Sequence, residues 1–190
     1  MQTMNVGLVA FGMSARVFHA PFLHVHPNLN LKTVVERHLK RSREYYPYVE
    51  VVSDIDTMLE DEEIDLVVVT TPNRSHYDLC AKAIKAGKHV VVEKPFTVST
   101  QEADALIELA RENNVLLSVF QNRRWDGDFL TIQELLEQNT LGRLVEFESH
   151  FDRFRNYSKA NAWREAEEEP GSGILYDLGS HLIDQSMQLF

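Results

Sequence analysis

The sequence predicts an α/β protein with a doubly wound parallel sheet, followed by the start of an α+β domain with an open sheet. Short continuous apolar runs recur along the first two thirds of the chain, and segments with helical spacing separate them. This pattern is typical of parallel strands that helices cover on both faces. After Phe120 the sequence becomes polar and aromatic and then alternates. We therefore expect two domains, residues 1–121 and residues 122–190.

Six buried strands are expected in the first domain. They cover residues 5–10, 31–36, 49–52, 64–70, 89–93 and 116–120. Asp54 or Asp56 can cap a short helix, and Ser75 and Ser99 each precede an acidic residue by three positions, which predicts two capping boxes. Gly87 is expected to end the helix that Ser75 begins. Repeated strand–helix–strand units with such short connections indicate parallel strands.

The second domain is expected to contain two helices and one strand. The helices cover Phe129–Gln138 and Ile174–Phe190, and the strand covers Leu144–Arg155, where apolar and polar residues alternate. Such a strand has an unpaired edge, and the last helix has an uncovered apolar face. Both features invite pairing with another chain, so a homo-oligomer is expected.

Composition excludes several classes of partner. The chain has 190 residues, with 19 basic and 29 acidic side chains and a formal charge of −10. A nucleic-acid surface or an anionic membrane face would need clustered Lys and Arg, so neither partner is expected. No apolar run has membrane-spanning length, and the first residues lack the charged and apolar regions of a secretory signal, so neither a membrane span nor a signal is expected. The single cysteine, Cys80, fits a cytoplasmic protein.

The turn after the first strand indicates a dinucleotide site of the Rossmann type. A Gly-x-Gly-x-x-Gly motif is expected there, and this chain has only its middle glycine, Gly12, with alanines at the outer places. A side chain at the middle place would push the phosphates away. Phe11, Gly12, Met13 and Ser14 are therefore cofactor-binding candidates. The alternative is a plain strand-to-helix turn.

Glu36 and Arg37 lie at the end of the second strand, where the adenosine ribose of a dinucleotide binds. A carboxylate there favours NAD, because it accepts hydrogen bonds from the ribose hydroxyls. An arginine there makes NADP possible, because it can pair with a 2′-phosphate. The sequence leaves NAD and NADP open.

Two further strands end in polar residues at the same edge of the sheet. One is followed by Thr71, Pro72 and Asn73, with His76 three residues beyond, and the other ends in Glu93 and Lys94. Ligands bind beyond the carboxyl ends of parallel strands. We expect all six residues to contribute to the cofactor site, although His76 can equally fill the first helical turn. Lys94 is also a catalytic candidate, because a lysine there can polarise or protonate a carbonyl oxygen.

Asp177 and His181 are four residues apart in the last predicted helix, and Asp184 follows three residues later. On an α-helix these side chains share one face. A carboxylate beside an imidazole suits proton transfer. A metal site is the weaker alternative, because no cysteine and no HExxH spacing supports it, and none is predicted.

Several stretches together resemble the Gfo/Idh/MocA family of NAD(P)-dependent oxidoreductases, in wording closest to its branch of NADP-dependent scyllo-inositol dehydrogenases. They are Gly12–Pro21, Thr71–Asn73, Glu93–Pro95, Asn122–Asp126 and Gly173–His181. The resemblance implies hydride transfer between a nicotinamide and a sugar or polyol carbon. It also implies that Lys94 and His181 form a proton relay assisted by Asp177, with Asn122 at the cofactor.

Members of this family continue well beyond the equivalent of Phe190, so the chain resembles their N-terminal part. The expected function is that of a dehydrogenase acting on an inositol-like polyol. The alternative is a non-catalytic NAD(P)-binding module or an inactive fragment.

Overall fold

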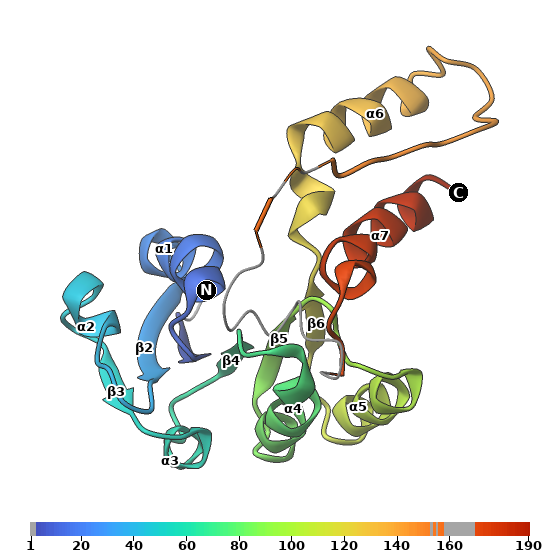
Figure 1. The fold of residues 1–190 in the computed structure, drawn as a ribbon. Coiled ribbons are helices and arrows are strands. Elements are labelled where there is room, and N and C mark those ends of the chain that lie inside the picture. The colour runs from blue at the N-terminus through green and yellow to red at the C-terminus, as the bar shows by residue number, and fades with distance from the viewer. Residues whose placement is uncertain (1–2, 153, 155, 158–169) are drawn as a thin grey trace. The chain divides into compact units, whose positions relative to one another are not determined.

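The computed structural model of the chain describes residues 3–152, 154, 156–157 and 170–190. The chain forms two compact units, Met1–Val119 and Phe120–Phe190. Figure 1 shows the sheet and its helices in the first unit and a mostly helical second unit. No helix within the described ranges combines the length and the apolar character that crossing a membrane requires.

The predicted parallel sheet is confirmed, and each strand has bounds within two residues of the expected ones. The strands are β1 (Met4–Val9), β2 (Leu29–Val35), β3 (Glu50–Val52), β4 (Leu66–Val69), β5 (His89–Glu93) and β6 (Leu117–Phe120). They are arranged in the order β3-β2-β1-β4-β5-β6. The chain therefore passes from one side of β1 to the other between β3 and β4. In open α/β sheets, ligands bind at such a switch point.

Helices cover both faces of the sheet. The helical elements of the first unit are η1 (Ala15–His19), α1 (Ala20–Val25), α2 (Ser42–Tyr45), α3 (Ile55–Leu59), η2 (Asn73–Ser75), α4 (His76–Lys85) and α5 (Thr100–Glu112). One buried cluster joins α3, α4 and α5 to the sheet. A second cluster joins η1 and α1 to the opposite face. The side chains of Val67 and Val68, neighbours in β4, belong to different clusters, as the two-residue period of a strand requires.

The predicted caps form at two of three helices. The backbone N–H of Thr57 donates to Asp54 at the start of α3 (2.9 Å), and the N–H of Glu102 donates to Ser99 at the start of α5 (3.3 Å). The prediction for Ser75 is wrong in this respect. Ser75 has helical dihedral angles, whereas a capping residue is extended, and its hydroxyl donates to Thr71 and Pro72 instead.

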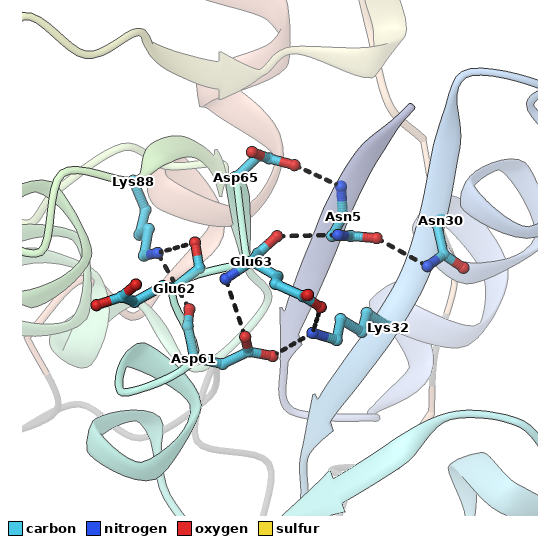
Figure 2. Close-up of polar contacts among 8 residues, drawn as sticks. All are labelled: Asn5, Asn30, Lys32, Asp61, Glu62, Glu63, Asp65 and Lys88. Atoms are coloured by element: carbon cyan, nitrogen blue, oxygen red, sulfur yellow. Dashed lines mark hydrogen bonds and ion pairs between the residues drawn. The ribbon is translucent and has the colours of Figure 1, made fainter. Parts of the chain in front are cut away.

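A polar network ties together the amino ends of the strands, at the edge opposite the candidate site (Figure 2). The backbone N–H of Asn5 in β1 donates to the carboxylate of Asp65 (2.7 Å), just before β4. Lys32 of β2 forms ion pairs with Asp61 and Glu63, each at 2.6 Å. Lys88, buried before β5, donates to the carbonyl oxygens of residues 61 and 62. These contacts hold the loop between α3 and β4 against three strands.

The second unit contains η3 (Asn122–Trp125), α6 (Gly127–Glu137), η5 (Leu175–Gly179) and α7 (Ser180–Leu189). The predicted strand Leu144–Arg155 is wrong for its described residues, 144–152 and 154, none of which is in a strand. A strand needs the backbone groups of a neighbouring strand, and no described segment of this unit pairs with these residues. Residues 153 and 155 lie outside the described ranges.

Candidate active site

Four loops of the first unit follow strands that are neighbours in the sheet, so they meet at its carboxyl edge. The carboxyl ends of β1, β2, β4 and β5, with the segments that follow them, carry every cofactor-binding candidate except Asn122. Because β1 lies between β2 and β4, its loop occupies the switch point of the sheet. The topology therefore gathers these sequence-predicted residues along one edge.

The turn after β1 keeps a glycine-like backbone although two of its glycines are replaced. Ala10 has a φ of 76°, in the left-handed region that a glycine adopts more easily. Ala15, at the third place, is fully buried against the sheet. A Cβ built on Gly12 meets no atom within 4 Å. In the dinucleotide-binding motif, the middle glycine is the one that faces the pyrophosphate. Gly12 has free space at this place, so the turn fits a dinucleotide.

Ser14, His19 and Glu93 form a network that joins this turn to the end of β5. The hydroxyl of Ser14 donates to Oε1 of Glu93, and Nε2 of His19 lies 2.8 Å from the same oxygen. His19 and Glu93 are 5% and 12% exposed. Burial raises the pKa of Glu93, but the hydrogen bonds from His19 and Ser14 outweigh it, so the pKa is below its ordinary value. Glu93 is therefore a buried carboxylate anchor.

Sequence reasoning assigned no role to His19. It lies in the stretch Gly12–Pro21 that carries the family resemblance, five residues after Ser14. That spacing brings both side chains to one carboxylate because η1 is a π-helical turn, in which residues five apart are bonded. In an α-helix, residues five apart do not lie on one face, so the sequence spacing alone does not predict this contact.

Lys94 follows the anchor directly. Its backbone N–H donates to Oε2 of Glu93 (3.2 Å), so the second oxygen of the carboxylate is hydrogen-bonded as well. The Lys94 side chain is half-buried. The lysine is thus attached to the network that holds the turn at residues 12–14.

Thr71, Pro72, Asn73 and His76 follow β4. Asn73 is buried. The imidazole of His76 is fully buried, with Nε2 2.9 Å from the carbonyl oxygen of Thr71 and Nδ1 2.9 Å from that of Pro95. His76 therefore ties the loop after β4 to the loop after β5. A direct contact of His76 with the cofactor stays a prediction.

Glu36 follows β2, and its carboxylate accepts hydrogen bonds from the next loop. The donors are the backbone N–H of Arg41 (3.1 Å), the backbone N–H of Ser42 (2.9 Å) and the hydroxyl of Ser42 (2.5 Å). Arg37 is exposed. These contacts make Glu36 an organiser of the loop that leads into α2.

Asp177, His181 and Asn122 belong to the second unit. His181 is buried in the first turn of α7, and Asp177 is half-buried in η5. The predicted single helix is here a π-helical turn, η5, that continues into α7, and a common face for Asp177 and His181 stays a prediction. Asn122 is half-buried at the start of η3.

Asp184, expected beside these residues, has a partner of its own. Arg124 of η3 donates to both its carboxylate oxygens, at 2.8 and 2.6 Å, and this hydrogen bonding raises the pKa of Arg124. Gln185, also in α7, donates to the carbonyl oxygen of Arg123 at 2.9 Å. The two contacts fix α7 to η3. Sequence reasoning gave Arg124 no role beyond its place in the resemblance.

Lys94 lies in the first unit, whereas Asp177 and His181 lie in the second. Their assembly into one proton relay stays a prediction. Within the described ranges, no group of three His, Cys, Asp or Glu side chains could hold a metal ion.

Comparisons with known proteins decide the family. A family model described as "Oxidoreductase family, NAD-binding Rossmann fold" matches residues 4–121, and a model of the "GFO/IDH/MocA C-terminal domain" matches residues 129–190. The chain belongs to the Gfo/Idh/MocA oxidoreductase family. Its first unit is therefore an NAD(P)-binding Rossmann domain, and its second unit is the start of the Gfo/Idh/MocA C-terminal domain.

Individual relatives agree with this assignment. An uncharacterized oxidoreductase of Schizosaccharomyces pombe is 45% identical over 100% of the chain and 53% of its own length. The scyllo-inositol 2-dehydrogenase (NADP(+)) of Bacillus subtilis is 40% identical over 100% of the chain and 52% of its own length. A solved NAD-binding protein from Listeria innocua has a TM-score of 0.88 and 32% identity, covering 100% of this chain and 55% of that one. The chain thus spans about half the length of the curated relatives it matches.

Proposed function

We propose that this chain is the cofactor-binding part, with the beginning of the substrate-binding part, of a dehydrogenase that acts on a CH–OH group of a sugar or polyol. The substrate class is inositol-like, which the similarity to the scyllo-inositol enzyme supports. The observation that carries the proposal is the position of Lys94. It follows a buried carboxylate that is bonded to the dinucleotide-binding turn through Ser14.

The roles of the side chains follow from their chemistry. Residues of the turn at 11–14 and Asn73 hold the dinucleotide, whose nicotinamide supplies or accepts the hydride when bound. Lys94 donates a hydrogen bond to the substrate oxygen, and Lys94 and His181 pass the proton of the hydroxyl between them. Asp177 orients the imidazole of His181.

The proposal is tested by mixing NADP⁺ or NAD⁺ with a panel of inositols and following the absorbance of the reduced nicotinamide. The assay uses this chain and any longer product of its gene. Reduction of either cofactor with one of the inositols supports the proposal. Binding of the cofactor without turnover, in both proteins, contradicts it.

A Lys94→Ala variant is expected to lower turnover by about 100-fold or more, because a positioned acid or base contributes that much. The dissociation constant of the cofactor is expected to stay within about threefold, since the Glu93 anchor remains. Steady-state kinetics and a binding titration measure the two quantities. Lys85→Ala, at the exposed end of α4, is the matched control. An equal loss of binding and turnover would show that Lys94 only binds.

A second candidate function is a non-catalytic NAD(P)-binding module. It is favoured by the second unit, where α7 exposes Ile183 and Met187 and the segment 144–152 has no strand partner among the described residues. The same side chains support the predicted homo-oligomer, since a partner chain would cover them. Cofactor binding without turnover in any product of the gene would favour the module.

A further inference from the structure

We propose that His19 is a positioning residue, which fixes the carboxylate of Glu93 and through it holds the dinucleotide-binding turn at residues 12–14 against the end of β5. The inference rests on the dinucleotide site of the proposed function. The role requires no contact between His19 and the cofactor or the substrate.

The carboxylate of Glu93 joins three segments of the chain. Its Oε1 accepts from the hydroxyl of Ser14 and lies 2.8 Å from Nε2 of His19, and its Oε2 accepts from the backbone N–H of Lys94. The pKa of Glu93 is below its ordinary value, so the group is ionised near neutral pH and can only accept hydrogen bonds. Nε2 of His19 therefore carries a hydrogen and donates it to Glu93.

Of these donors, His19 is the one that belongs to a packed helical element. Ser14 lies in the turn after β1, and Lys94 lies in the loop after β5. The buried alanines Ala15 and Ala20 flank the His19 segment and pack against the sheet, and the imidazole itself is only 5% exposed. A site residue keeps its geometry when packed neighbours fix the groups that support it. His19 is therefore the fixed support of the Glu93 carboxylate.

The backbone around His19 is shaped for this contact. The N–H of Ala20 donates to the carbonyl oxygen of Ala15, five residues earlier, and His19 has a φ of −123°. An α-helical residue has a φ of about −63°. A regular α-helix would also place Ser14 and His19 on different faces. The π-helical turn thus brings His19 to the oxygen that Ser14 binds, and such turns are frequent at functional sites.

Loss of the imidazole is expected to disturb the turn without changing any of its residues. A buried carboxylate that loses a donor is left under-satisfied, so Glu93 would turn toward water. The hydroxyl of Ser14 is bonded to the same oxygen and would follow it. The backbone of the turn would then move away from the position that accepts the pyrophosphate.

The test is a calorimetric titration of the chain with NADPH and with NADH, at a temperature at which thermal melts show every variant to be folded. His19→Leu is expected to weaken the dinucleotide that the wild type binds more tightly by about tenfold, because a hydrogen bond to a charged group is lost. His19→Gln carries an amide nitrogen at the reach of Nε2, so it is expected to bind within about threefold of the wild type. His19→Asn is one methylene shorter and cannot reach Glu93, so it is expected to bind as weakly as His19→Leu.

His24→Leu is the matched control. His24 is an exposed histidine of α1, and its Nδ1 lies 2.7 Å from the hydroxyl oxygen of Tyr48, away from Glu93. Its replacement also removes a hydrogen bond and is expected to lower the melting temperature. The dissociation constant of the dinucleotide is expected to stay within about twofold. A loss of stability alone would then not explain a loss of binding in His19→Leu.

A Glu93→Gln background shows whether His19 acts through the carboxylate. There, adding His19→Leu is expected to change the dissociation constant by no more than about twofold, because neighbours in one network are not additive. A side chain that only stabilises its helix would have the same effect in both backgrounds. Should Glu93→Gln fail to fold, the comparison of His19→Gln with His19→Asn still decides.

The outcomes separate the inference from the function beneath it. Unchanged binding in His19→Leu, or equal binding by His19→Gln and His19→Asn, overturns the inference and leaves the dehydrogenase proposal standing. No binding of either dinucleotide by the wild-type chain overturns both.

Discussion

At the scale of single residues, the turn after β1 shows how a degenerate glycine motif can keep its geometry. Ala10 takes the left-handed φ of 76° in place of the first glycine. Gly12 is the one glycine of the motif that remains, and a Cβ built on it meets no atom within 4 Å, so a phosphate can approach its backbone. For an alanine this conformation costs about 1–2 kcal/mol. The contacts around the turn must offset that cost, and the hydroxyl of Ser14 on Glu93 is one of them.

Ala10→Gly is expected to leave the free energy of unfolding unchanged or slightly higher. The relief of the left-handed strain offsets the extra freedom of glycine in the unfolded chain, about 0.5–1 kcal/mol. Urea denaturation measures the difference. The control is Ala105→Gly, an exposed position inside α5, which is expected to lose about 1 kcal/mol. A comparable loss in both variants would mean that Ala10 is not strained.

At the scale of elements, the candidate catalytic helix of the second unit is fixed by a short partner. Arg124 of η3 contacts both oxygens of Asp184 in α7, and the two side chains are 42% and 13% exposed. A bidentate, partly buried pair is stronger than an ordinary surface pair. Its role would be to hold α7, which carries His181, in one orientation.

Removing either partner is expected to loosen α7. A double-mutant cycle with Arg124→Ala and Asp184→Ala should give a coupling of about 1–2 kcal/mol, between the surface and buried cases. Hydrogen exchange of the backbone amides of α7 measures the local stability of this helix, and faster exchange is expected in either variant. Arg111→Ala is the control, because its pair with Glu108 is exposed at 73% and 62% with a distance of 3.4 Å, and little change is expected. Equal exchange in wild type and Arg124→Ala would contradict the role.

At the scale of the whole molecule, hydrogen-bonded carboxylates make the stability of the folded protein depend on pH. The pKa of Glu93 is lowered by His19 and Ser14 against the effect of burial, and that of Asp61 is lowered first by its hydrogen bond to Lys32. A group with a lowered folded pKa stabilises the protein above its unfolded pKa. That contribution is lost as the pH falls through the folded pKa.

We therefore expect the melting temperature of the chain to fall as the pH drops below about 4.5, the ordinary value for Glu93. Glu93→Gln should be less stable than the wild type at pH 7, and the difference should shrink as the pH falls below that value. Thermal melts between pH 7 and pH 3 follow both quantities. Glu112→Gln, an exposed position of α5, is the control. A difference that stays constant over this range would refute the linkage.

The sequence by itself determined the parallel sheet and the family. Apolar runs of strand length between capped helices require burial on both faces, so the sequence alone predicts the positions of all six strands. Because the predicted strands are parallel, the residues that follow β1, β2, β4 and β5 were expected at the carboxyl edge of the sheet. The capping patterns at Asp54 and Ser99 were equally local, because a cap involves residues only three apart.

Only the tertiary structure decided which side chains are partners. Glu93 meets Ser14 and His19 across more than seventy positions of sequence, and Arg124 meets Asp184 across sixty. Nothing in the spacing of a single sequence encodes such pairs. The strand expected at Leu144–Arg155 failed for a related reason: its alternation suits a strand, but a strand forms only where another backbone supplies its hydrogen bonds.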